Sequence, residues 1–80
     1  MEDLISNTAL NIINNSEEPL ETKEILERIA EKIKKESVTR TKIFYRLNLL
    51  RGERKIKGKF TGPGKGVWIW WRIDAFPSKT

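Results

Sequence analysis

The chain has 80 residues, of which 38% are hydrophobic and 34% are charged, and its formal net charge is +5. This length is enough for one compact domain. Cysteine and histidine are both absent, which excludes disulfides, the usual zinc ligands and nucleophile pairs that need histidine, so we expect no catalytic residue, no metal and no cofactor.

Two helices are predicted in the first half of the chain. Apolar residues at helical spacing predict the first over about 3–15, and a cluster of turn formers that ends in Pro19 follows it. Thr22 is a good N-cap for the second, over about 22–35, which has apolar residues on one side and Glu and Lys on the other. The acidic residues near its start are expected to favour the helix N-terminus and to form no active site.

A third helix is predicted over about 39–51, capped by Ser37 or Thr39 and ended near Gly52. About three to five residues separate it from the second helix, which is the spacing that a helix-turn-helix requires. Its apolar positions, which we expect to face the core, are Ile43, Leu47 and Leu50.

A hairpin is predicted over about 55–73. Lysines at every second position from Lys55 to Lys59 predict a half-buried strand whose lysines face water. The glycine-rich segment 62–66 then supplies a turn, and a second strand rich in β-branched and aromatic residues follows. The tail 74–80 is expected to be frayed.

Three segments carry the pattern of a known family: the start of the second helix at 20–25, the third helix at 38–50 and the hairpin at 56–73. In this pattern the chain resembles the winged helix-turn-helix family. Its phrases Pro-Leu-Glu-Thr-Lys-Glu-Ile at 19–25 and Lys-Phe-Thr-Gly-Pro-Gly-Lys-Gly-Val-Trp at 59–68 are most similar to the HARE-type DNA-associated domain. The resemblance implies a single α+β domain over residues 1–80, in which the third helix lies in the major groove of DNA and the hairpin is the wing.

A helical wheel gives an independent reading of the third helix. With its apolar residues inward, polar residues face outward and two arginines lie towards the flanks. Lysine and arginine pair with phosphates or guanine, asparagine with adenine, and hydroxyls with phosphate oxygens. An ordinary solvated helix would show similar charges. The candidate nucleic-acid-binding residues of this helix are Arg40, Thr41, Lys42, Tyr45, Arg46, Asn48 and Arg51.

The wheel also turns Leu49 outward. Either the helix is rotated from this estimate, or Leu49 packs under the wing or against a partner.

The wing adds Lys57, Lys59 and Lys65 around a glycine tip, which suits contacts with phosphates or with an adjacent minor groove. The alternative is that these lysines only keep an edge strand from associating with other sheets. The glycines themselves fit turn chemistry and not a nucleotide-binding loop, because a strand follows them where such loops need a helix.

Trp68, Trp70 and Trp71 fall within four residues, so strand alternation cannot bury all of them on one face. We expect Val67, Ile69, Trp71 and Ile73 to face the helices, with Trp71 in the core. Trp68 and Trp70 then face outward, where one of them is predicted to contact a second copy of the chain or a protein partner.

The charge is divided along the chain. Residues 1–36 carry nine acidic and five basic side chains, whereas residues 37–80 carry two acidic and eleven basic ones. A strongly basic half is typical of a protein that binds a polyanion. We therefore predict a non-enzymatic double-stranded DNA-binding protein, a transcriptional regulator or chromatin-associated factor, which would be a dimer if binding is sequence-specific.

Two alternatives stay open. One is a winged-helix module for protein–protein interaction within a transcription or other nucleic-acid-processing complex, and the other is an RNA-binding winged helix.

The longest apolar run, at 67–71, is too short to span a bilayer, and the first residues are acidic where a secretory signal would be basic. We expect no membrane partner and a cytoplasmic, nucleoid-associated location.

Overall fold

A computed structural model describes residues 4–33, 38–64 and 66–74 of the chain. Within these residues the chain forms three helices and three short strands, and the helices precede the long hairpin as the sequence predicts. The fold is therefore a small α+β domain. The elements in chain order are α1 (Leu4–Asn14), β1 (Leu20–Glu21), α2 (Thr22–Lys32), α3 (Arg40–Gly52), β2 (Ile56–Thr61) and β3 (Val67–Arg72).

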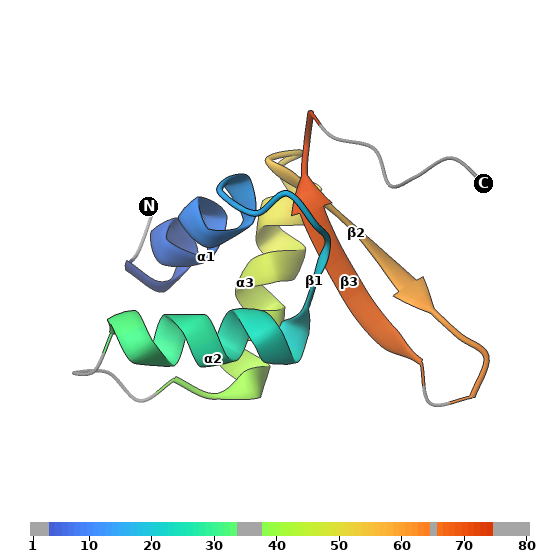
Figure 1. Cartoon of the computed structure of the whole chain (residues 1–80), viewed down its shortest axis with the longest axis horizontal. Helices are drawn as coiled ribbons and strands as arrows, with labels where there is room; N and C mark the ends of the chain where they lie inside the picture. The colour runs from blue at the N-terminus through green and yellow to red at the C-terminus, as the bar shows by residue number, and fades with distance from the viewer. Residues whose placement is uncertain (1–3, 34–37, 65, 75–80) are drawn as a thin grey trace.

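The described strands form one antiparallel sheet with the order β1-β3-β2. The two-residue strand β1 was not expected from the sequence, because it is too short to show any alternation. It pairs Leu20 with Trp70 and Glu21 with Ile69. Figure 1 shows the β2–β3 hairpin projecting away from the helices, with β1 joining it to the start of α2.

The core lies between the helices and one face of this sheet. Helices α1 and α3 bury the apolar stripes that their spacing predicts, including Ile43, Leu47 and Leu50 of α3. Of the apolar residues of α2, Ile25 and Ile29 are buried, Leu26 is partly buried and Ala30 is exposed. The sheet contributes Leu20, Ile56 and the indole of Trp70. The buried apolar residues of the helices are Ile5, Ala9, Ile12, Ile13, Ile25, Ile29, Ile43, Leu47 and Leu50, and Ile33 joins them from just after α2.

The start and the end of α2 differ from prediction. Glu21, and not Thr22, is the N-cap, and the Glu24 carboxylate accepts a hydrogen bond from the Glu21 N–H at 2.8 Å. Thr22 is the first helical residue and is buried. The helix ends at Lys32 because Ile33 adopts an extended conformation and turns into the core, so residues 33–39 separate α2 from α3 and the connection is longer than expected.

The limits of α3 agree closely with the sequence. The Thr39 hydroxyl accepts a hydrogen bond from the Lys42 N–H at 3.2 Å, which makes Thr39 the N-cap, and the helix ends at Gly52. The other candidate cap, Ser37, lies outside the described residues, as do Lys65 at the hairpin tip and positions 75–80 of the predicted tail.

The predicted orientation of β3 is wrong. Trp70 is completely buried and Trp68 packs against the core, whereas Trp71, which was expected in the core, lies half-buried on the opposite face. The neighbours of Trp70 explain the inversion. Its ring lies over Gly58, its register partner on β2, where an added Cβ would overlap the ring, and its indole N–H donates to the Thr22 hydroxyl at 2.9 Å.

Candidate nucleic-acid interface

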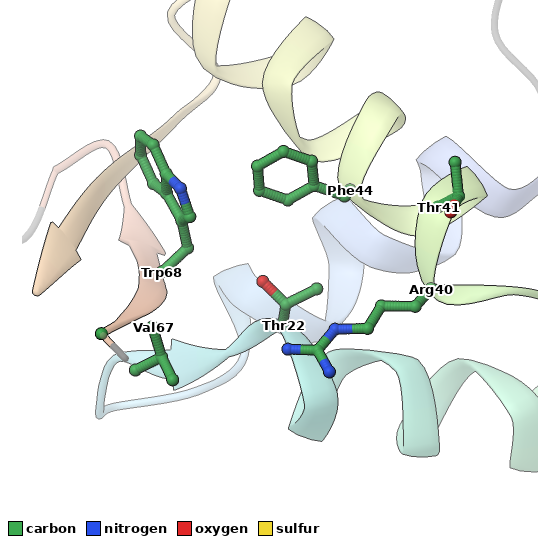
Figure 2. A pocket seen from close by; sticks show the side chains of 7 residues that line it. Thr22, Arg40, Thr41, Phe44, Val67 and Trp68 are labelled. Carbon is green, nitrogen blue, oxygen red and sulfur yellow. The ribbon is translucent and has the colours of Figure 1, made fainter. Parts of the chain in front are cut away.

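A hollow of about 330 Å³ opens between the first turns of α2 and α3 and the start of β3. Figure 2 shows Arg40 reaching from the start of α3 towards Thr22, while the ring of Phe44 points towards Trp68. The hollow therefore has an aromatic wall and a cationic group at its opening. The residues that line it are Thr22, Arg40, Thr41, Phe44, Gly66, Val67 and Trp68.

An aromatic cluster fixes the hairpin against α3. The indoles of Trp68 and Trp70 are stacked, with centroids 5.2 Å apart and planes at 18°. The ring of Phe44 meets both of them edge-on at 6.0 Å, and Phe60 meets Trp68 in the same way at 6.1 Å. Each such contact adds about 0.5–1.5 kcal/mol to the free energy of burial, so the angle between the hairpin and α3 is held by side-chain packing.

Arg51 extends this cluster to the end of α3. Its guanidinium carbon lies 5.2 Å from the centroid of the Trp68 ring, which is a cation–π contact. Arg40, at the start of α3, lines the first hollow together with Trp68. Two arginines from opposite ends of α3 therefore border the side of the helix that faces the hairpin.

The outer face of α3 carries polar side chains. Thr41 and Tyr45 are exposed, and Tyr45 retains 61% of its accessible surface. Asn48 is partly buried, and its side-chain amide donates to the carbonyl of Phe44 at 3.0 Å. A hydroxyl, a phenol and an amide therefore follow one another along the exposed side, which is the arrangement that the helical wheel predicts.

Lys42 and Arg46 lie on the flank of α3 away from the hairpin. They share a helical stripe with Leu49, and Leu49 lines a hollow with Ser6 and Leu10 of α1. The basic residues of α3 are therefore divided between two flanks, with the polar stripe between them.

Leu49 is 47% exposed, so its outward position is confirmed. Of the explanations considered for it, a rotated helix is wrong, because the predicted apolar residues of α3 are the buried ones. Packing under the wing is also wrong, because its neighbours belong to α1 and to the end of α3.

The wing lysines do not face α3. Side chains alternate along a strand, and Gly58 lies opposite buried Trp70, so Lys57 and Lys59 project from the other face of the hairpin. There they line a second hollow together with Trp71 and Ile73. Of the α3 residues with which the sequence grouped these lysines, Arg51 lines the same hollow, and the others are not among its lining.

The predicted partner contact at Trp70 is wrong, because this side chain has no accessible surface and lies inside the domain. Trp68 is half-buried, and its ring is covered in part by Phe60 and Arg51.

Sequence reasoning missed Phe44, which joins α3 to the hairpin, and Arg54, which lines the second hollow. The bulky apolar character of Phe44, one residue after buried Ile43, was the available signal.

Among the described residues, no helix is long and apolar enough to cross a membrane, and no cluster of three or more acidic side chains could hold a metal ion. Comparisons of the chain with protein-family models, with curated proteins and with solved structures find no match.

Proposed function

We propose that the chain is a winged helix-turn-helix domain that binds double-stranded DNA, with α3 in the major groove and the β2–β3 hairpin as the wing. The observation that carries this proposal is the arrangement of α3, in which basic residues on both flanks border an exposed polar stripe. A major groove admits an α-helix and has a phosphate backbone on each side.

Each part of the helix then has a role. Arg40 and Arg51, on the side of the hairpin, pair with phosphates of one strand, and Lys42 and Arg46 pair with phosphates of the other. The stripe formed by Thr41, Tyr45 and Asn48 faces the base edges, where hydroxyl and amide groups can read donors and acceptors. The hairpin, with Lys59 on β2, approaches the neighbouring backbone, and Lys65, which lies outside the described residues, is expected to add a further phosphate contact.

The charge distribution of the chain also supports this orientation. The excess of acidic side chains lies in residues 1–36 and the excess of basic ones in residues 37–80, which include α3 and the hairpin. A duplex is therefore attracted more strongly to the second half of the chain than to the first.

Salt dependence tests the proposal. A fluorescently labelled duplex of random sequence is titrated with the protein at about 50 and about 200 mM salt, and the dissociation constant is measured by anisotropy. About six phosphate contacts predict a loss of affinity of roughly a thousandfold. Absence of binding at the lower salt concentration contradicts the proposal and favours a role in protein assembly, and preferential competition by duplex RNA favours an RNA-binding role.

Variants on the two flanks sharpen the test. Arg40→Gln and Arg46→Gln should each lower the slope of log affinity against log salt by about 1, because each removes one phosphate contact. Arg28→Gln on exposed α2 is the matched control and should leave the slope unchanged. Equal effects of all three variants would indicate attraction by net charge alone.

A further inference from the structure

The second hollow lies between the end of α3 and the hairpin strands, and it has a volume of about 550 Å³. Residues from the end of α3, the α3–β2 turn, β2 and β3 meet there. The proposed contacts of α3 with DNA do not use most of this surface. The residues that line it are Arg51, Arg54, Ile56, Lys57, Gly58, Lys59, Trp71 and Ile73.

The lining of the hollow divides into an apolar floor and a basic rim. Trp71 is half-buried and Ile73 is 41% exposed, so both supply accessible apolar surface, whereas Ile56, which also lines the hollow, is itself buried. All four ionisable residues among the lining are basic, namely Arg51, Arg54, Lys57 and Lys59. Apolar surface ringed by charges of one sign indicates a partner that is both apolar and acidic.

The spacing of the floor suits an extended chain. Trp71 lies near the end of β3 and Ile73 follows its last residue, and these two lining residues are two positions apart in the chain. An extended peptide presents alternate side chains at the same interval. In addition, β2 is an edge strand of the described sheet, and edge strands accept an added strand.

We propose that this hollow binds an extended acidic segment of another protein, with two apolar side chains, two residues apart, on the floor and flanking carboxylates on the basic rim. A peptide fits better than single-stranded nucleic acid, because the accessible part of the floor is one half-buried tryptophan and one isoleucine, which offer little area for stacking bases. The proposal does not depend on duplex binding by α3.

Selection from a phage-displayed library of random linear peptides tests the proposal. Immobilised full-length protein should enrich acidic sequences that contain paired apolar residues, and labelled synthetic peptides of these sequences should bind in anisotropy titrations. Replacing either the apolar pair by serine or the acidic residues by glutamine should weaken binding about tenfold or more. A selection that enriches no sequence of this composition overturns the proposal.

Matched variants identify the surface. Ile73→Ser removes part of the floor, and Arg54→Asp reverses a rim charge while keeping a residue that tolerates the positive φ of 63° at this position. Both should weaken peptide binding about tenfold or more. The controls are Leu4→Ser, which alters an exposed apolar residue of α1, and Arg28→Glu on α2, and both should bind as the parent does.

Further measurements separate the outcomes. Circular dichroism and urea unfolding verify that each variant folds, so that lost binding is not lost structure. Equal peptide binding by Ile73→Ser and the parent overturns the proposal, and so does an oligothymidylate that binds this surface more tightly than the selected peptides. Duplex affinity should be unaffected by Ile73→Ser, so a failure of duplex binding in every sample would count against the function of α3 and not against this hollow.

Discussion

The two faces of β3 show how similar residues acquire different roles within one strand. On the face towards the helices, Trp70 is fully buried and donates a hydrogen bond to Thr22. On the outer face, Trp71 is half-buried and borders an open hollow. The difference arises from the neighbours, because Trp70 lies over Gly58, whereas the register partner of Trp71 is Lys57. Whether an aromatic residue of β3 is buried therefore depends on its neighbours across the sheet and not on its position along the strand.

The largest expected effect is a difference between two truncations. Trp70→Ala should lower the free energy of unfolding by about 3–5 kcal/mol, because it leaves a cavity in the core. Trp71→Ala should cost only about 1–2 kcal/mol, since it removes a partly exposed side chain. The midpoint of urea unfolding measures both at constant m-value. Equal losses, or a larger loss for Trp71→Ala, would contradict the assignment of the two faces.

Gly58 provides the next test of the inner face. An added methyl group at this position would overlap the Trp70 ring, so Gly58→Ala should destabilise the domain by about 1–3 kcal/mol through overpacking. Gly52, near the end of α3, has open space around its Cα and is the matched control. Gly52→Ala should be neutral or stabilising by up to about 1 kcal/mol. The reverse order would show that Trp70 does not lie over Gly58.

The helices and the hairpin could be predicted from the sequence because their signals are local. Apolar spacing identified the buried residues of α3, and Thr39 was a recognisable cap. Strand β1 and the buried side of β3 could not be predicted in this way. Residues 67–73 are apolar on both faces, so alternation alone did not distinguish them, and the deciding contacts join Trp70 to residues far away in the chain.

In the candidate site, too, the features with local sequence signals could be predicted and those set by long-range contacts could not. The exposed polar stripe of α3 was predicted from helical periodicity, and it has the expected orientation. Lys57 and Lys59 were grouped with α3 on the basis of charge; the register of the hairpin places them on the face opposite Trp70, and of the α3 candidates Arg51 shares their hollow. One signal was available, since an isolated glycine in a strand often marks close approach by another group, and Gly58 could have indicated the inner face.

The hydrogen bond between Trp70 and Thr22 is expected to have a smaller effect. Thr22→Val keeps the shape of the side chain but leaves the buried indole N–H without its acceptor, so the free energy of unfolding should fall by about 1–2 kcal/mol. Thr22→Ser keeps the hydroxyl and should recover most of this loss. Chemical denaturation measures the difference. If Thr22→Ser loses as much stability as Thr22→Val, the packing of the Thr22 methyl group and the start of α2 matter more than the hydrogen bond.

The smallest expected effect separates two arginines that are close in sequence. Arg51 contacts the Trp68 ring, so Arg51→Gln should lower the free energy of unfolding by about 0.5–1 kcal/mol, and it should also reduce the salt slope of duplex binding by about 1. Both arginines line the outer hollow, but Arg54 lies beyond the end of α3, so Arg54→Asn should leave the salt slope unchanged while weakening the selected peptides. Because each substitution removes one positive charge, net charge cannot explain a difference between them. An identical loss of duplex affinity in both variants would mean that DNA and peptide use one continuous basic surface, and the separation of the hairpin into two functional faces would then be wrong.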